Sequence, residues 1–173
     1  MFALNDKVLD RAGKVFSIAE IRPMDFGNGN EDYFILKPCF PYDFSSGYQC
    51  FVPISKADQL LKKVMNREEA LKLIDDYSSL DVLVAHNPRE KKLFFQQILS
   101  AGERVDVLKV YKTLRYSREE RLKKNKPFSD FDSRLLKNLN NLFISELSIA
   151  LNIPVTSVPA FVSERLGEAI FES

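Results

Sequence analysis

A dense run of basic side chains occupies residues 105–130 of this 173-residue chain. The run starts with apolar residues at helical spacing and ends in arginines and lysines. Ammonium and guanidinium groups are strong hydrogen-bond donors with a positive charge, so their usual partners are phosphates and carboxylates. The chain has a formal net charge of only +1, so this clustering needs an explanation. The run contains Lys109, Lys112, Arg115, Arg118, Arg121, Lys123, Lys124 and Lys126.

The positive charge is confined to the middle of the chain. Residues 89–137 carry 14 basic and 7 acidic groups, a net charge of +7, whereas residues 1–54, 55–88 and 138–173 carry −2, −1 and −3. Many lysine-rich helices only present a solvated face. Such faces usually mix both signs at i,i+4, and this excess is uncompensated in the sequence. We therefore predict a surface that binds the DNA backbone without reading bases. It would contain Arg89, Lys91, Lys92, Lys109, Lys112, Arg134 and Lys137.

The residue types that usually carry catalysis are sparse. His86 is the only histidine and lies in an expected linker. Cys39 and Cys50 lack metal-ligand spacing, and the chain has no phosphate-binding GxxxxGK[ST] loop. The acidic pairs are adjacent in sequence, so their side chains diverge on a helix. We expect no catalytic residue, no metal and no cofactor, and hence no enzyme.

The composition is that of a soluble globular protein, with 45% apolar and 28% charged residues. No apolar run approaches the roughly 20 residues needed to cross a bilayer. The first ten residues lack the basic and apolar regions of a secretory signal. We therefore expect a cytoplasmic location, no membrane partner, and two reduced thiols at Cys39 and Cys50.

The first 54 residues predict β structure. Apolar and polar residues alternate, or nearly alternate, over residues 7–9 and 14–21, and further strands are predicted over 33–36 and 48–52. Residues 24–30 read as a turn, and a loop is marked by Ser45, Ser46 and Gly47. Four or five short strands indicate a small curled sheet or an SH3-like barrel. An exposed edge of such a sheet can pair with a strand of another protein.

From residue 55 onward the apolar spacing is helical. We expect a short helix over 55–63 and others starting at Asn66, Asn87 and Glu103. The longest helix is predicted over 130–151 with Ser129 as its N-cap, and the last over about 159–171. Residues 78–85 are ambiguous between a linker and a helix end. The sequence thus predicts an α+β protein, with a β domain over 1–54 and a helical domain over 55–173.

The order of these segments resembles the CarD/CdnL family of bacterial RNA polymerase-binding transcription regulators. In the helical half the resemblance rests on LSAGE (99–103), VLKVYKTL (107–114), PFS (127–129) and ISELSIA (144–150). In the front half it rests on NDKV (5–8), Gly13, IAEI (18–21), YFILK (33–37) and VP (52–53). That half resembles the family's Tudor-like barrel, which is similar to the polymerase-interacting domain of the transcription-repair coupling factor.

The resemblance implies a protein that bridges two partners. The barrel would dock on the RNA polymerase β subunit by sheet-edge pairing, and the helical domain would contact promoter DNA and modulate the open complex. A nucleoid-associated location follows, and we expect a monomer when the protein is free. The implied polymerase-binding residues are Tyr33, Ile35, Lys37, Gln49 and Phe51.

Two positions depart from the family pattern. Relatives place a tryptophan at the start of the basic helix, where it wedges into the minor groove, and here Pro88 stands at that position. Relatives also often carry an arginine before the Val-Pro pair, where this chain has Phe51. The missing tryptophan motivates an alternative, a polymerase- or protein-interaction module without DNA binding.

Overall fold

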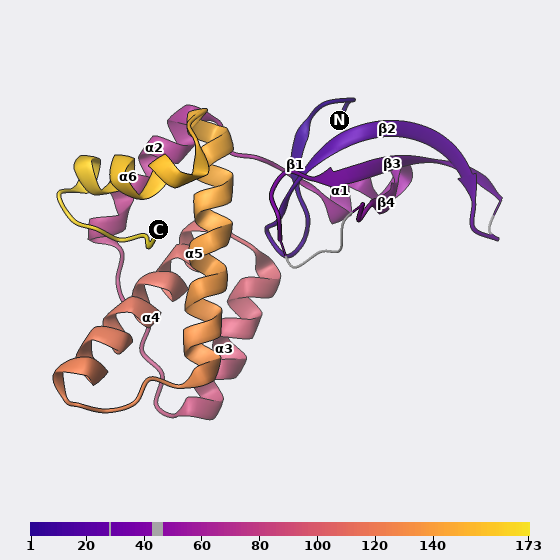
Figure 1. Ribbon diagram of the computed structural model, residues 1–173. Helices are drawn as coiled ribbons and strands as arrows, with labels where there is room; N and C mark the ends of the chain where they lie inside the picture. Colours follow the sequence, from indigo (N-terminus) through magenta and orange to yellow (C-terminus); the bar gives the residue numbers. More distant parts are fainter. Residues whose placement is uncertain (28, 43–46) are drawn as a thin grey trace. The chain divides into compact units, whose positions relative to one another are not determined.

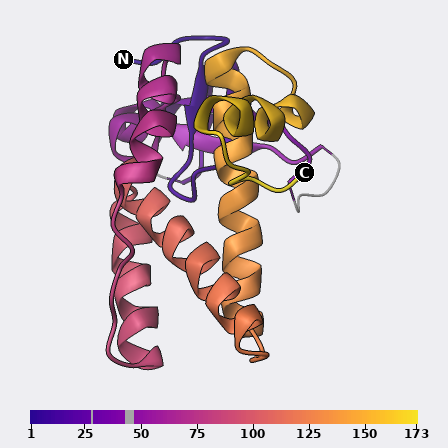
Figure 2. The ribbon, with the colours of Figure 1, turned by 90° about the vertical axis from the view of Figure 1, so that its left-hand side faces the viewer.

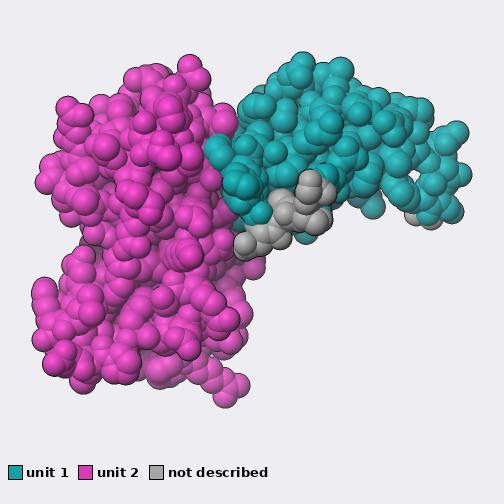
Figure 3. Space-filling view, in the orientation of Figure 1, with its two compact units in different colours: residues 1–64 teal, residues 65–173 magenta. Residues whose placement is uncertain are grey.

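The computed structural model describes residues 1–27, 29–42 and 47–173. The chain forms two compact units, Met1–Val64 and Met65–Ser173 (Figure 3). Unit 1 is built around an antiparallel sheet and unit 2 is helical, so the protein is α+β. The sequence placed the division after residue 54. The division lies after residue 64 because Ala57 and Leu61 are buried in the core of unit 1.

Unit 1 contains an open five-stranded sheet in the order β4-β3-β2-β1-β5, with every neighbouring pair antiparallel (Figure 1). A barrel would require its outer strands to close on one another, and no such pairing occurs among the described residues. The strands are β1 (Lys7–Leu9), β2 (Val15–Asp25), β3 (Asn30–Pro38), β4 (Cys50–Pro53) and β5 (Lys62–Lys63). The core under the sheet consists of Val8, Phe16, Ile18, Phe34, Leu36, Val52, Ala57 and Leu61.

The strands of unit 1 differ in length from those predicted. β2 and β3 run on to pair Asp25 with Asn30, so the connection between them is shorter than the predicted turn over 24–30. Asn28 in that turn, and Ser45 and Ser46 in the next loop, lie outside the described residues. The predicted helix over 55–63 is instead a 3-10 turn η1 (Ile54–Lys56), one turn of helix α1 (Ala57–Leu60), and strand β5.

Unit 2 consists of five α-helices and two 3-10 turns among its described residues. These are α2 (Arg67–Asp76), η2 (Tyr77–Ser79), α3 (Pro88–Ala101), α4 (Arg104–Lys123), α5 (Asp130–Leu151), η3 (Val155–Ser157) and α6 (Val158–Leu166). In Figure 2, α4 crosses obliquely between α3 and α5. Residues 80–87 form the irregular connection between η2 and α3.

The predicted helix starts follow from capping side chains. Asn66 accepts a hydrogen bond from the backbone N–H of Glu69, whose carboxylate accepts from the N–H of Asn66 in return. Asn87 caps α3 by accepting from the backbone N–H of Glu90, and Ser129 caps α5 by accepting from the backbone N–H of Asp132. Gly102 ends α3 with a φ of 69°, a left-handed conformation that favours glycine.

The C-terminal helix is shorter than predicted. α6 ends at Leu166, because Gly167 adopts a φ of 76° and turns the chain out of the helix. The residues that follow return to the core of unit 2, where Ile170 and Phe171 are buried. No single helix in the described ranges is long and apolar enough to span a membrane, and only the bent pair of α5 with residues 155–166 meets the length and composition requirements together.

Candidate nucleic-acid and polymerase-binding surfaces

The starts of α3 and α5 are joined by two side-chain contacts. The ammonium nitrogen of Lys91 lies 2.7 Å from a carboxylate oxygen of Asp132. The ammonium nitrogen of Lys92 lies 5.0 Å from the centre of the Phe131 ring, within cation–π range. These contacts bring two of the predicted cation groups to one end of unit 2. We name the exposed cations of these two helix starts, Arg89, Lys92, Arg134 and Lys137, the α3–α5 basic group.

Lys91 is the member of the predicted set that is used to hold this end together. Asp132 is 5% exposed and its backbone N–H donates to the Ser129 hydroxyl. One of its carboxylate oxygens accepts from Lys91, and the other, Oδ1, has no hydrogen-bond partner among the described residues. A carboxylate this buried needs a compensating charge. Lys91 therefore stabilises the contact of α3 with α5 more than it offers charge to a ligand.

Lys109 and Lys112 are also engaged within the fold. Lys109 forms an ion pair with Asp106 one turn earlier, at 3.1 Å. The three donors of the Lys112 ammonium are matched by three backbone carbonyls, those of Tyr77 at 2.9 Å, Ser78 at 3.1 Å and Leu80 at 2.6 Å. The same nitrogen lies 5.1 Å from the Tyr77 ring centre. Lys112 thus satisfies the carbonyls at the end of η2.

The remaining cations of the 105–130 run are partly compensated, contrary to the impression from the sequence. Arg118 pairs with the Glu172 carboxylate at 2.6 Å, and Lys123 with Glu120 at 3.2 Å. The Arg121 guanidinium donates to the carbonyl of Pro127. Lysines and arginines near the C-terminal end of α4 also face the negative end of the helix dipole. Much of this charge therefore stabilises α4 and its neighbours.

The C-terminal residues 169–172 lie in a slot formed by side chains of α4 and α5, which the sequence did not predict. The Asn140 side chain forms two hydrogen bonds with the backbone of Glu172, accepting from its N–H at 2.9 Å and donating to its carbonyl at 3.0 Å. The Tyr111 hydroxyl lies 2.6 Å from the Ile170 carbonyl oxygen. Arg115 donates to the carbonyl of Ala169. The spacing of apolar residues predicts only a helix over about 159–171 here, and Gly167 is the local signal that could have placed the helix end earlier.

Burial changes the acid–base behaviour of the two tyrosines that face this slot. Burial raises the pKa of Tyr111 well above its ordinary value, although the nearby Arg115 guanidinium works in the opposite direction. Burial likewise raises the pKa of Tyr77, against the lowering effect of the charge and hydrogen bond of Arg115. Both hydroxyls therefore remain protonated, and able to donate, at neutral pH.

A second internal ion pair was not predicted. Glu146 is 5% exposed, and its carboxylate accepts from the Arg104 guanidinium and from the backbone N–H of Met65. It thereby holds the start of α4 and the first residue of unit 2 against α5. A charged residue in the apolar stretch ISELSIA was the available signal, because a buried carboxylate requires partners.

In unit 1 the predicted polymerase-binding residues of β3 share one face of the sheet. Tyr33, Ile35 and Lys37 alternate with Phe34 and Leu36, which point into the core. Phe51 of β4 is the cross-strand partner of Ile35 and therefore lies on the same face. Gln49 precedes β4 and is exposed. Ile35 is 1% exposed, so it supports this face and offers little surface to a partner.

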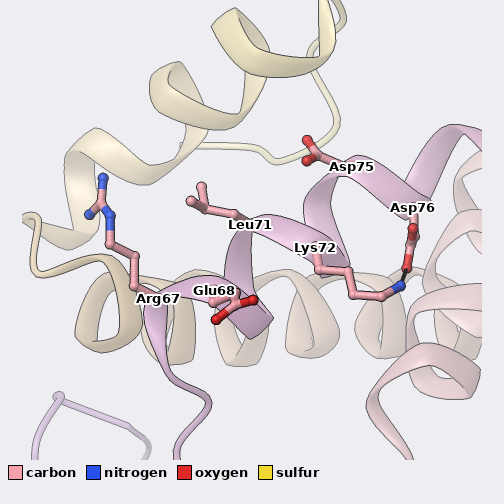
Figure 4. A pocket seen from close by; sticks show the side chains of 6 residues that line it. All are labelled: Arg67, Glu68, Leu71, Lys72, Asp75 and Asp76. Carbon is pink, nitrogen blue, oxygen red and sulfur yellow. Dashed lines mark hydrogen bonds and ion pairs between the residues drawn. The ribbon is translucent and has the colours of Figure 1, made fainter.

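An open groove of about 630 Å³ lies along α2, apart from the predicted sites (Figure 4). Charges of both signs line it, and Asp75 is held by a bidentate ion pair with Arg165 of α6 at 2.7 and 2.8 Å. That hydrogen-bonded guanidinium lowers the pKa of the Asp75 carboxyl. No group of three potential metal ligands occurs in the described part of the chain. The groove has no grouping of nucleophile and base.

Comparisons with known proteins provide no assignment. No protein-family model matches the chain, and no curated protein matches it either.

Proposed function

We propose that this protein is a bacterial transcription regulator of the CarD/CdnL type, which binds the RNA polymerase β subunit through unit 1 and promoter DNA through unit 2. Binding both partners would modulate the stability of the open complex, with no chemical step carried out by the protein itself. The proposal places the protein in the cytoplasm, associated with the nucleoid, and monomeric when free. It rests on the order of sequence segments and on the two surfaces described above.

The DNA-binding part of the proposal rests on one observation, the contact between the N-terminal ends of α3 and α5. The Lys91–Asp132 and Lys92–Phe131 contacts bring the α3–α5 basic group to one end of unit 2, where its four cations are exposed. A phosphate backbone is recognised by such cations through charge, independently of base sequence. The proposed DNA surface is therefore smaller than the predicted one, without Lys91, Lys109 and Lys112.

The sheet of unit 1 supports the polymerase-binding half. We propose that it is a Tudor-like domain, although its described strands form an open sheet. β4 is the outermost strand on one side, and its outer edge has no partner strand in the described ranges. Such an edge offers backbone donors and acceptors to an added strand. This is the recognition mode that the family resemblance implies.

Charge reversal of the α3–α5 basic group tests the DNA half. The variant Lys92→Glu/Arg134→Glu/Lys137→Glu should lose promoter association in a gel-shift or anisotropy titration with the full chain. The matched control is Lys72→Glu on α2, an exposed lysine that pairs with Asp76 of its own helix. Pull-down of RNA polymerase by the full chain tests the other half. Failure of wild-type protein to retain polymerase would contradict it.

A specific observation favours the alternative, a protein-interaction module without DNA binding. Four predicted or neighbouring cations, Lys91, Lys109, Lys112 and Arg118, are already paired within unit 2. Their engagement leaves a weaker positive surface than the net charge of the segment suggests. Unchanged promoter association in the triple charge-reversal variant, with polymerase binding retained, would favour this alternative.

A further inference from the structure

The outer face of the β3–β4 ribbon carries a cluster of three aromatic rings that the core does not use. Phe26 follows β2, and its ring centre lies 5.1 Å from that of Tyr33 on β3. It also lies 6.1 Å from the ring centre of Phe51 on β4. Both pairs meet edge to face, the geometry that aromatic rings prefer. Phe26 is 58% exposed and Phe51 41% exposed, so the cluster is a surface feature.

The cluster lies beside the open edge of the sheet. β4 is an outermost strand, and within it Val52 points into the core while Phe51 points to the opposite face. A strand that paired with β4 would place alternate side chains on that face, next to Phe51. The chemistry at the edge therefore specifies an extended peptide with an apolar side chain at this position.

The charges on the same face do not oppose an apolar partner. Glu20 and Arg22 of β2 are the cross-strand partners of Ile35 and Tyr33, so they share the face of the cluster. They pair with one another at 2.5 Å, which cancels their charges locally. Glu31 and Lys37 of β3 also lie on this face, one of each sign, so the four charges named here sum to zero and give no net attraction to a charged partner.

We propose that the Phe26–Tyr33–Phe51 cluster is the specificity determinant of the unit 1 interface, and that it selects an extended strand of the polymerase β subunit carrying an apolar residue opposite Phe51. This inference rests on the proposed function and adds the chemistry of the contact. Association at this surface is driven by burial of aromatic area. It therefore tolerates salt, in contrast to an interface built on ion pairs, which screening would weaken.

Affinity of the full chain for purified core RNA polymerase, measured by surface plasmon resonance, tests the proposal. Truncating a buried interface aromatic commonly weakens binding by about tenfold or more, so Phe51→Ala and Phe26→Ala should each do so. Phe51→Asp should abolish binding, because it places a negative charge against the partner's apolar residue. Ile21→Ala is the matched control, since Ile21 is 45% exposed and lies on the other face of β2, opposite Phe34. Its affinity should equal that of wild type.

The possible outcomes distinguish a failure of this inference from a failure of the proposed function on which it rests. Wild-type binding that persists when salt is raised, and is lost in the Phe51 variants, supports both. Wild-type binding that the Phe51 and Phe26 substitutions leave unchanged overturns the cluster as the determinant and leaves the polymerase partner in place. Binding that weakens steeply with salt also overturns it. No binding by the wild-type chain overturns the proposed partner and the inference together. Circular dichroism of each variant establishes that the sheet remains folded.

Discussion

The Lys91 ammonium, on a side chain that is 27% exposed, lies 2.7 Å from the carboxylate of Asp132, a buried residue of a different helix. This pair connects the first turn of α3 to the first turn of α5. The exposed cations Lys92 and Arg134 follow one and two residues later in the same helices. Lys91, which the sequence predicts as a DNA contact, thus helps to position other residues of the proposed DNA-binding surface.

Lys91→Met should destabilise the protein strongly. Removing one partner of a buried ion pair typically costs about 3–5 kcal/mol, because the remaining charge is left without compensation. Lys92→Met is the control, since Lys92 lies over the exposed Phe131 ring and its loss should cost no more than about 1 kcal/mol. Urea unfolding measures both. Equal losses in the two variants would contradict a structural role for Lys91.

Lys112→Met should also destabilise unit 2, with little effect on DNA affinity. The substitution keeps an unbranched apolar chain but leaves the carbonyls of Tyr77, Ser78 and Leu80 without their donor. Hydrogen bonds from a charged donor typically contribute about 1.5–3 kcal/mol, and water at the exposed Ser78 carbonyl should offset part of the loss. Lys109→Met breaks only the pair with Asp106 and should cost less than about 1 kcal/mol. A large loss of DNA affinity in folded Lys112→Met protein would show that Lys112 belongs to the DNA-binding surface after all.

Alkaline pH should unfold unit 2 through Tyr111 and Tyr77. Their pKa values are raised above the ordinary 10.0 by burial, so the protonated forms stabilise the folded state. This contribution is complete below pH 10 and is lost as pH rises through the folded-state pKa values. Thermal melts of wild type from pH 8 to 11 should show a fall in Tm that begins near pH 10. Tyr111→Phe should reduce the pH dependence while lowering Tm at neutral pH, and an unchanged slope would contradict this origin.

The thiols of Cys39 and Cys50 should react slowly in the folded protein. Burial raises the pKa of each thiol above its ordinary 9.0, and the carboxylate of Asp10 adds to the effect at Cys50. Since the thiolate is the reactive species, alkylation at pH 8 should be several-fold slower in native protein than in urea. Single Cys→Ser variants assign each rate. Equal rates in native and denatured protein would show that both thiols are freely accessible.

The general layout of the chain could be predicted from local signals. Caps at Asn66, Asn87 and Ser129 mark helix starts because their side chains bond to nearby backbone groups, and residue type reports this directly. The strand predicted over residues 33–36 likewise lies within β3. The end of α6 was missed although Gly167 marks it locally, whereas the short strand β5 was missed because its pairing with β1 depends on contacts distant in sequence.

The candidate site was harder to predict than the fold. Lys112 and Lys92 look alike in sequence, yet one is enclosed by three carbonyls and the other is exposed. The difference depends on where η2 places its carbonyls, which no spacing rule reveals. In the same way, the use of Arg118 by Glu172 required the return of the C-terminal residues to α4. The net charge of a segment gives its excess of cations over anions, but only the fold determines how many of those cations remain exposed and unpaired.

The salt dependence of promoter DNA binding tests the central claim most directly. Each phosphate neutralised contributes about −0.9 to the slope of log affinity against log salt concentration. With four exposed cations in the α3–α5 basic group, the full-length protein should give a slope of about −3 to −4. The Lys92→Glu/Arg134→Glu/Lys137→Glu variant should bind weakly with a slope near zero. No DNA binding by wild type, or a steep slope unchanged in the variant, would contradict the account.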